Sequence, residues 1–308
     1  MIDPVAVAMD IGGTGIKCAL ADPAGEIRHT AWFPTGAERG PDAVVATILE
    51  TASELVATAK TQGMEPVAVG LIAPGVIDEA NGVAVFSANL GFRDAPLRDL
   101  VASHTGLPTA LGHDVRAAAL AEARLGAGRS TRRMLFVAIG TGIAAGYAVD
   151  GVVDPGGHGA SGEIGHIVVR TGPDARTCGC GARGCLETYA SASAIARSYG
   201  ADGASDVAKR VNEGDETATR VWQEAVETLA DGLLTGIALW DPRLIVLGGG
   251  LARAGDTLLE PLRAALERRR TFHQLPEVDV AELGNEAGCQ GAALLALDLI
   301  EAEGHEAG

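Results

Sequence analysis

The stretch DIGGTGIK at residues 10–17 follows the apolar run Val5–Met9 and leads into a second apolar run, Ile16–Ala21. This order predicts a buried strand, a glycine turn and a returning strand. Glycines let backbone N–H groups approach a phosphate closely, and a carboxylate at the strand end suits Mg²⁺. The spacing fits neither a Walker A loop nor a dinucleotide fingerprint, and an ordinary tight hairpin is the alternative. The nucleotide-binding candidates are Asp10, Gly12, Gly13, Thr14 and Lys17.

A second glycine turn repeats this arrangement. The apolar run Met134–Ile139 leads into Gly-Thr-Gly at 140–142, and apolar residues return as far as Val149. The matching context indicates an internal duplication, although Gly-Thr-Gly is a common turn and coincidence stays open. A third glycine run, at 248–250, ends the apolar run 244–247, and we expect it to make room for adenosine. These turns add the nucleotide candidates Gly140, Thr141, Gly142, Gly248, Gly249 and Gly250.

Apolar residues at helical spacing predict several helices outside these turns. One covers 41–62, another carries the stripe from Val226 to Trp240 and stops at Asp241-Pro242, and a third covers 256–270. A last helix from about 290 is expected to pack back on the N-terminal part of the chain.

Three cysteines crowd together after a histidine. Cysteine and histidine are the ligands of closed, tetrahedral structural zinc sites, and the glycines between the cysteines permit the tight turns of a zinc knuckle. Reduced surface thiols or a single disulfide are the alternatives. The two remaining cysteines, Cys18 and Cys289, are isolated and are expected to be buried. The zinc candidates are His166, Cys178, Cys180 and Cys185.

Composition limits the class of protein. The chain has 308 residues, of which 47% are hydrophobic, so we expect about two domains with packed α/β cores. A formal net charge of −16 argues against nucleic acid and anionic membranes as partners. The first residues lack a basic leader region, and no apolar run approaches the ~20 residues of a membrane span, so we expect a cytoplasmic protein.

Taken together, the motifs resemble the ROK family (repressor, open reading frame, kinase). The matching stretches are DIGGTGIK at 10–17, IGTGI at 139–143, GEIGH at 162–166, CGCGARGCLE at 178–187 and LGGG at 247–250. The resemblance implies an actin-like ATPase (ribonuclease H-like) fold with two duplicated α/β domains and a cleft between them. We expect a small domain over 1–112, completed by the last helix at about 290–308, and a large domain over 113–289 that carries the zinc knuckle.

Within the family, the chain is most similar to zinc-containing ATP-dependent glucokinases. The repressor branch carries an N-terminal helix-turn-helix domain, whereas here the phosphate motif begins at residue 10, so the kinase branch is implied. The resemblance also implies a homodimer or homotetramer and closure of two domains over the sugar, with a hinge near 112. Closure would exclude water that ATP would otherwise phosphorylate.

The resemblance also places the sugar site. Phosphoryl transfer to a hydroxyl needs a carboxylate within hydrogen-bond reach of that hydroxyl. The family's catalytic Asp corresponds to Asp114. Asp114 also precedes a predicted helix, so a role as the helix N-cap is the alternative. His166 would bind zinc through one ring nitrogen and sugar through the other. The hydroxyl attacked is expected to be O6 of a hexose. The sugar-binding candidates implied by the resemblance are Gly75, Asn89, His113, Asp114, Glu163, His166 and Glu187.

Two residues depart from the family pattern around Asp114. His113 stands where the family commonly has an Asn that binds sugar hydroxyls, and Arg116 replaces a small or amide residue. A single hydrogen bond can change sugar preference, so glucose is not the only candidate. N-acetylglucosamine, N-acetylmannosamine, mannose, fructose and allose are alternatives within the same reaction class. A sugar-sensing protein with weak catalysis is the alternative from another class, and a polyphosphate-dependent glucokinase also stays open.

Overall fold

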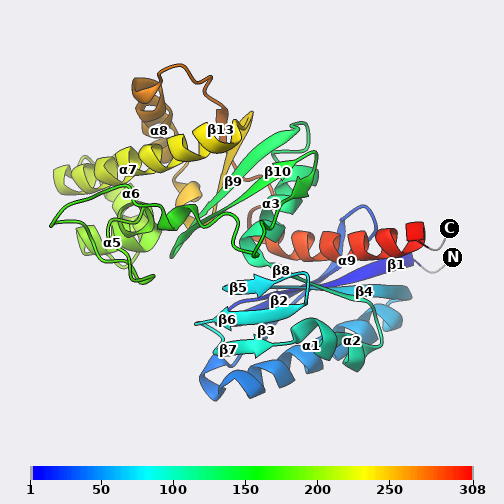
Figure 1. Cartoon of the computed structure of the whole chain (residues 1–308). Helices are drawn as coiled ribbons and strands as arrows, with labels where there is room; N and C mark the ends of the chain where they lie inside the picture. Colours follow the sequence, from blue (N-terminus) through cyan, green and yellow to red (C-terminus); the bar gives the residue numbers. More distant parts are fainter. Residues whose placement is uncertain (1–2, 307–308) are drawn as a thin grey trace. The chain divides into compact units, whose positions relative to one another are not determined.

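The computed structural model describes residues 3–306, which fall into two compact units. Of the described residues, unit 1 comprises 3–121, 155–161 and 285–306, and unit 2 comprises 122–154 and 162–284. Each unit is built around a five-stranded sheet (Figure 1). The domain limits expected from the sequence, with a hinge near 112, stay predictions, because a hinge is defined by motion rather than by contacts.

The sheet of unit 1 begins with the predicted hairpin. Its strands have the order β3-β2-β1-β4-β8. Strand β2 is antiparallel to both of its neighbours, β1 and β3, whereas β4 and β8 are parallel to β1. The parallel strands therefore end at the same edge of the sheet, where the first glycine turn also lies. The bounds are β1 Asp3–Ile11, β2 Gly15–Ala21, β3 Ile27–Pro34, β4 Met64–Ala73 and β8 Thr109–His113.

The two faces of this sheet carry side chains of different size, because successive residues of a strand point to opposite faces. Val5, Val7 and Met9 of β1 join the large-residue core under α1, whereas Ala6 and Ala8 join a small-residue core under α9. The alanine side chains let α9 approach the sheet closely. Helix α9 lies along β1 and β8 (Figure 1). The helices of unit 1 are η1 Ala37–Arg39, α1 Pro41–Thr61, α2 Leu97–Thr105 and α9 Ala287–Glu306.

A small three-stranded sheet, not predicted from the sequence, belongs to unit 1. Its order is β5-β6-β7, with bounds Val76–Asp78, Val83–Ser87 and Phe92–Ala95. It follows directly on the end of β4, so its turns lie near the end of the main sheet where the glycine turn is found. Gly13 of that turn shows this, because a Cβ added there would lie 3.5 Å from Cβ of Asn89.

Unit 2 repeats the sheet of unit 1. Its order is β11-β10-β9-β12-β13. As in unit 1, the second strand, β10, is antiparallel to its two neighbours, whereas β12 and β13 are parallel to β9. The same order and directions in both units support the internal duplication inferred from the two Gly-Thr-Gly turns. The bounds are β9 Arg133–Ile139, β10 Ile143–Val149, β11 Val152–Val153, β12 Leu244–Gly248 and β13 Glu277–Val280.

Helices of unit 2 pack with its sheet into one hydrophobic core, in which α7 supplies many of the buried side chains. Asp215 caps the start of α7 by accepting a hydrogen bond from the Ala218 N–H, and Asp241 ends it in the left-handed conformation. The helices are η2 Ile164–His166, α4 Glu187–Ala190, α5 Ala192–Tyr199, α6 Ala204–Asn212, α7 Glu216–Trp240, η3 Gly250–Ala254 and α8 Asp256–Arg269. Helix α3, Asp114–Arg124, follows β8, and η4, Gly284–Glu286, precedes α9.

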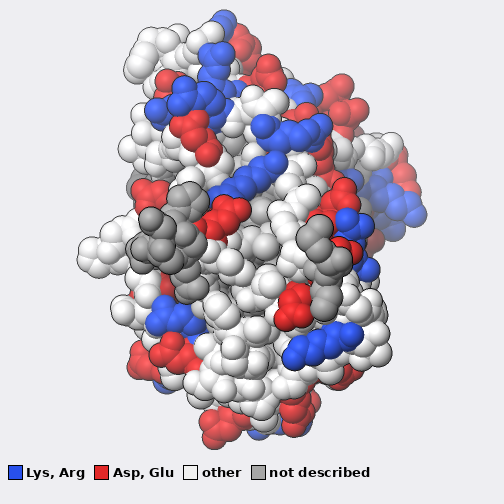
Figure 2. Space-filling model, turned by 90° about the vertical axis from the view of Figure 1, so that its right-hand side faces the viewer, with Lys and Arg blue, Asp and Glu red and all other residues white. Residues whose placement is uncertain are grey.

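The surface carries both signs of charge. On the face drawn in Figure 2, acidic and basic side chains are intermingled, although the chain as a whole has a formal net charge of −16. Within residues 3–306, no helix combines the length and the apolar character that crossing a membrane requires.

Candidate active site and metal centre

The first glycine turn joins β1 to β2 and is held by a residue that the sequence did not single out. Gly12 donates its N–H to the Gly15 carbonyl at 3.0 Å, which closes the turn. The buried Thr35 donates its hydroxyl to the Gly12 carbonyl at 2.6 Å and its backbone N–H to the Thr14 carbonyl at 3.3 Å. These two bonds from Thr35 hold the Gly12 and Thr14 carbonyl groups in place. No motif identified Thr35, because its role depends on a contact 23 residues away.

Asp10 and Lys17 lie on paired positions of β1 and β2, with Lys17 Nζ 4.0 Å from Asp10 Oδ2. Burial raises the pKa of Asp10 to about 6, against the lowering effect of Lys17, and the charge of Asp114 raises it further. Two carboxylates that repel each other beside a glycine turn are a donor set that a divalent cation neutralises. The residues present therefore fit Mg²⁺.

Asp114 is the first residue of α3, directly after β8. Its Oδ1 accepts a hydrogen bond from the Val115 N–H at 2.7 Å, which orients the carboxylate. Burial raises its pKa, against the lowering effects of that hydrogen bond and of the Arg116 charge. The neighbouring His113 is buried, and its Nδ1 lies 3.4 Å from Asp114 Oδ1. Asp114 is thus a fixed carboxylate with a raised pKa, suited to accept a proton.

The remaining candidates of unit 1 lie near these residues. Ala73 at the end of β4 pairs with His113 at the end of β8, so Gly75 follows the strand next to the catalytic candidate. Gly75 has φ +115°, and an added Cβ would lie 2.2 Å from the Phe86 carbonyl oxygen. The close packing against β6 thus requires this glycine independently of any sugar. Asn89 is exposed in the turn between β6 and β7.

The second glycine turn, in unit 2, is tied to Glu187. Glu187 Oε2 accepts a hydrogen bond from the Ile143 N–H at 3.0 Å, and a Cβ on Gly142 would lie 2.3 Å from the same oxygen. Gly140 donates its N–H to the Gly142 carbonyl at 2.9 Å. Glu187 was expected to bind sugar, and here one of its oxygens supports the turn beside it. The CGCGARGCLE motif identified Glu187, but the hydrogen bond of Glu187 to the turn could not be predicted from the sequence.

The third glycine run ends β12 beside a pocket. Gly249 has φ +80°, and a Cβ there would lie 2.6 Å from the Ile139 carbonyl at the end of β9, so this position requires glycine. Gly250 has open space around it and lines a pocket of about 590 Å³ together with Leu251 and with residues of α5 to α8. The lining mixes apolar side chains such as Trp222 with polar and charged ones such as Lys209 and Asn212.

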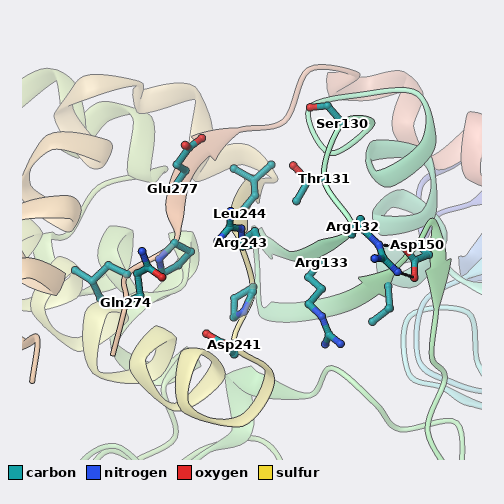
Figure 3. A pocket seen from close by; sticks show the side chains of 14 residues that line it. Ser130, Thr131, Arg132, Arg133, Asp150, Asp241, Arg243, Leu244, Gln274 and Glu277 are labelled. Atoms are coloured by element: carbon teal, nitrogen blue, oxygen red, sulfur yellow. Dashed lines mark hydrogen bonds and ion pairs between the residues drawn. The ribbon is translucent and has the colours of Figure 1, made fainter. Parts of the chain in front are cut away.

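A second, larger pocket of unit 2 has a different position. It has a volume of about 780 Å³ and is lined by basic and acidic side chains, among them the paired Arg132 and Asp150 (Figure 3). Arg133, Leu244 and Glu277 are the first residues of β9, β12 and β13, so this pocket lies where those strands begin. The glycine turns lie where β9 and β12 end. The larger pocket thus lies at the opposite end of these strands from the glycine turns.

The predicted zinc ligands converge in unit 2. The ligand atoms of His166, Cys178, Cys180 and Cys185 all lie within 4.8 Å of one another. Cys180 Sγ lies 3.7 Å from Cys185 Sγ, and Cys178 Sγ lies 3.5 Å from His166 Nδ1. Tetrahedral zinc with ordinary bond lengths puts its ligand atoms about 3.8 Å (S to S) and about 3.6 Å (S to N) apart. A disulfide needs about 2.05 Å. The spacing therefore fits zinc and excludes a disulfide among these cysteines.

Two cysteines of the cluster have pKa values shifted in opposite directions. The backbone N–H of Ala182, followed by the Cys178 thiol, lowers the pKa of Cys180, whereas burial raises the pKa of Cys185. The lowered pKa favours the thiolate form of Cys180, which is the form that binds metals. His166 turns Nδ1 toward Cys178 and Nε2 toward Glu163, whose Oε2 lies 3.7 Å away. The two ring nitrogens of His166 thus face different partners, Nδ1 the cysteine cluster and Nε2 the Glu163 carboxylate.

The predicted residues form two groups, one in each unit. Unit 1 brings together the first glycine turn, Asp10, Asn89, His113 and Asp114. Unit 2 brings together Glu163, His166 and the cysteines, and it ties Glu187 to the second glycine turn. The third glycine run lines its own pocket in the same unit.

Comparison with known proteins supports the family suggested by the motifs. The sequence matches the family model described as ROK family over residues 6–299. It is 33% identical to a glucokinase of Halalkalibacterium halodurans over 96% of both chains, and 32% identical to an N-acetylmannosamine kinase of Citrobacter koseri over 94% of this chain and 98% of that one. The crystal structure of a ROK family glucokinase from Streptomyces griseus, in complex with glucose and AMPPNP, is 30% identical, with a TM-score of 0.79 over 96% of this chain and 99% of that one.

These matches confirm both the family and the actin-like fold expected from the sequence. The duplicated sheet order provides an independent structural reason for the same assignment. The chain belongs to the ROK family.

Proposed function

We propose that this protein is an ATP-dependent hexokinase that phosphorylates O6 of glucose, with Asp114 as the general base. The observation that carries the proposal is the geometry around Asp114. A carboxylate with a raised pKa directly follows β8, in the same unit as the glycine turn between β1 and β2. Glucokinases among the relatives, and the AMPPNP and glucose bound in one of them, support the choice of donor and acceptor.

Each group has a defined task in this proposal. Asp114 accepts the proton of the attacking hydroxyl while the γ-phosphoryl group moves from ATP to the sugar oxygen, which leaves ADP and a sugar phosphate. The backbone N–H groups of the first glycine turn and Lys17 bind the phosphates, and the pocket beside Gly250 takes the adenosine. Mg²⁺, held near Asp10, supplies neutralisation of phosphate charge when it is bound.

The zinc site is proposed to be structural. With all four positions taken by protein ligands it would leave no open position for substrate. Its role would be to hold η2, so that His166 Nε2 and Glu163 face the sugar hydroxyls. Zinc on Nδ1 fixes the imidazole tautomer with its proton on Nε2, which makes His166 a hydrogen-bond donor to the sugar.

The choice of sugar is tested by measuring ADP release with Mg-ATP against a panel of hexoses and N-acetylhexosamines. We expect glucose to have the highest kcat/KM. If an N-acetylhexosamine leads instead, the N-acetylmannosamine kinase relative becomes the better guide and His113 becomes the first residue to exchange, since an imidazole replaces the family's amide. If no sugar stimulates ADP release, the kinase proposal fails and the sugar-sensing alternative replaces it.

The pKa of Asp114 leads to a prediction about pH. Burial raises this pKa, so the protonated and inactive form persists to a higher pH than for an ordinary Asp. A general base must be ionised, and we therefore expect kcat/KM for the sugar to fall as the pH is lowered through the raised pKa. The measurement is a pH profile of kcat/KM with saturating Mg-ATP. An activity that stays constant down to the range of an exposed carboxyl group would contradict this assignment.

The cytoplasmic location expected from the sequence and the homodimer or homotetramer expected from the family resemblance both remain expectations. Size-exclusion chromatography with light scattering would measure the oligomeric state.

A further inference from the structure

One carboxylate oxygen of Glu79 accepts three hydrogen bonds from the residues on either side of Asp114, the proposed base. Glu79, just after β5, uses Oε1 to accept the His113 backbone N–H at 3.0 Å, Arg116 Nε at 2.9 Å and Arg116 Nη2 at 2.7 Å. His113 precedes Asp114 and Arg116 follows it by two residues. The first turn of α3 is thus held at two points to a residue that lies 34 to 37 positions away in the sequence.

Burial makes this arrangement stronger than a surface ion pair. Arg116 is 4% exposed, and its side chain is therefore shielded from water on nearly all sides. A buried guanidinium needs a charged partner and good geometry, because an uncompensated charge in the interior is costly. The Glu79 carboxylate supplies that charge. The same burial leaves Arg116 almost no surface with which to contact a sugar.

The guanidinium also reaches the chain segment that precedes Glu163. Arg116 Nη1 donates to the Ser161 carbonyl at 3.4 Å. Segment 155–161 belongs to unit 1 and approaches β5 at a second point, where a Cβ on Gly159 would lie 2.7 Å from the Ile77 carbonyl oxygen. Arg116 therefore forms hydrogen bonds to Glu79 and to the Ser161 carbonyl. Ser161 is the last residue before the GEIGH stretch at 162–166.

We infer that Glu79 and Arg116 form a positioning pair that holds Asp114 in its reactive orientation and fixes segment 155–161 beside it. The inference rests on the proposed function, since it assigns a task within the same reaction. Arg116 was a candidate determinant of sugar preference, and here it acts on the base instead of the sugar. Small displacements of a catalytic group reduce the rate strongly, so loss of the pair should lower kcat while sugar binding is retained.

The test compares variants of the full-length protein. Arg116→Met removes the guanidinium and leaves the partly buried Glu79 carboxylate without its charge partner. The double variant Glu79→Met/Arg116→Met replaces both partners by apolar groups of similar size, which restores stability in many buried pairs. Arg28→Met is the matched control, because Arg28 forms an exposed ion pair with Asp22 in the same unit. Each variant is assayed for kcat, for sugar and ATP KM, for sugar affinity by calorimetry and for Tm.

We expect Arg116→Met and the double variant to lower kcat at least tenfold, with the sugar Kd within about threefold of wild type. The double variant should melt within a few degrees of wild type, and Arg28→Met should match wild type throughout. A stable double variant with wild-type kcat would show that the pair is only structural and would overturn the inference. A weakened sugar Kd with unchanged kcat would overturn it too, by making Arg116 a sugar contact.

Failure of the proposed function has a different signature. A wild-type protein without sugar-dependent ADP release refutes the kinase proposal, and the inference with it. An active wild type whose double variant is equally active refutes the positioning pair alone.

Discussion

Replacing Asp114 with Asn is expected to lower kcat for sugar phosphorylation by about 10³-fold, the range in which a single positioned general base contributes. Asn keeps an oxygen in the place of Oδ1, which accepts the Val115 N–H, so the start of α3 should stay folded. The amide cannot accept the hydroxyl proton, and the loss falls on the chemical step. Steady-state kinetics with glucose and Mg-ATP measure the effect.

Binding measurements separate this loss from a general disruption. Glucose affinity of Asp114→Asn should stay within an order of magnitude of wild type, and Tm should be equal or higher, because burial disfavours the charge of Asp114. Asp99→Asn serves as the matched control, since Asp99 is exposed on α2 in the same unit and pairs only with its neighbour Arg98 among the described residues. A variant at Asp114 that retains more than a tenth of wild-type kcat would remove the residue from the role of base.

Removal of zinc is the second large effect. We expect one zinc ion per chain, and we expect its removal by a strong chelator to lower Tm by more than ten degrees, because a structural zinc contributes folding free energy directly. Sugar phosphorylation should be lost together with it, since His166, the proposed zinc ligand, also lies beside Glu163. Elemental analysis, calorimetric melting and activity are measured on the same sample before and after treatment.

Two cysteine variants sharpen the zinc test. Cys185→Ser removes a fully buried ligand of the cluster, and the purified protein should contain well under one zinc per chain. Cys18→Ala removes a buried thiol that lies outside the cluster, and its zinc content should equal that of wild type. Wild-type protein without zinc, or with zinc whose removal leaves Tm unchanged, would show that the four side chains cluster without a metal.

Local signals in the sequence were enough to predict the hairpin and the cysteine cluster. A strand, a glycine turn and a returning strand follow one another directly in the chain, and β1 and β2 differ from the predicted ranges by a few residues at their ends. Asp241 ends α7 where the Asp-Pro pair predicted, although the helix begins at Glu216, well before the apolar stripe that revealed it. The cysteines lie within eight positions of one another, so their spacing alone suggested a knuckle.

Contacts between distant residues could not be predicted. The strand β5 has three residues, too few to show any periodicity, and Glu79 beyond it stands in no motif. Its bonds to His113 and Arg116 exist only because the small sheet folds over the end of β8. Thr35 is a further case, since a buried threonine under a turn looks in the sequence like any other residue at the end of a strand.

The interleaved composition of the units has a consequence for synthesis on the ribosome. Unit 2 is complete once residue 284 has emerged, whereas unit 1, which starts the chain, still lacks α9. That helix covers the alanine face so tightly that a Cβ on Gly70 would lie 1.8 Å from the Ala292 carbonyl oxygen. The first half of the nascent chain must therefore wait with one side of its sheet uncovered until the last helix arrives. Ribosome-bound chains that stop before residue 285 should be cut by protease within unit 1 while unit 2 resists.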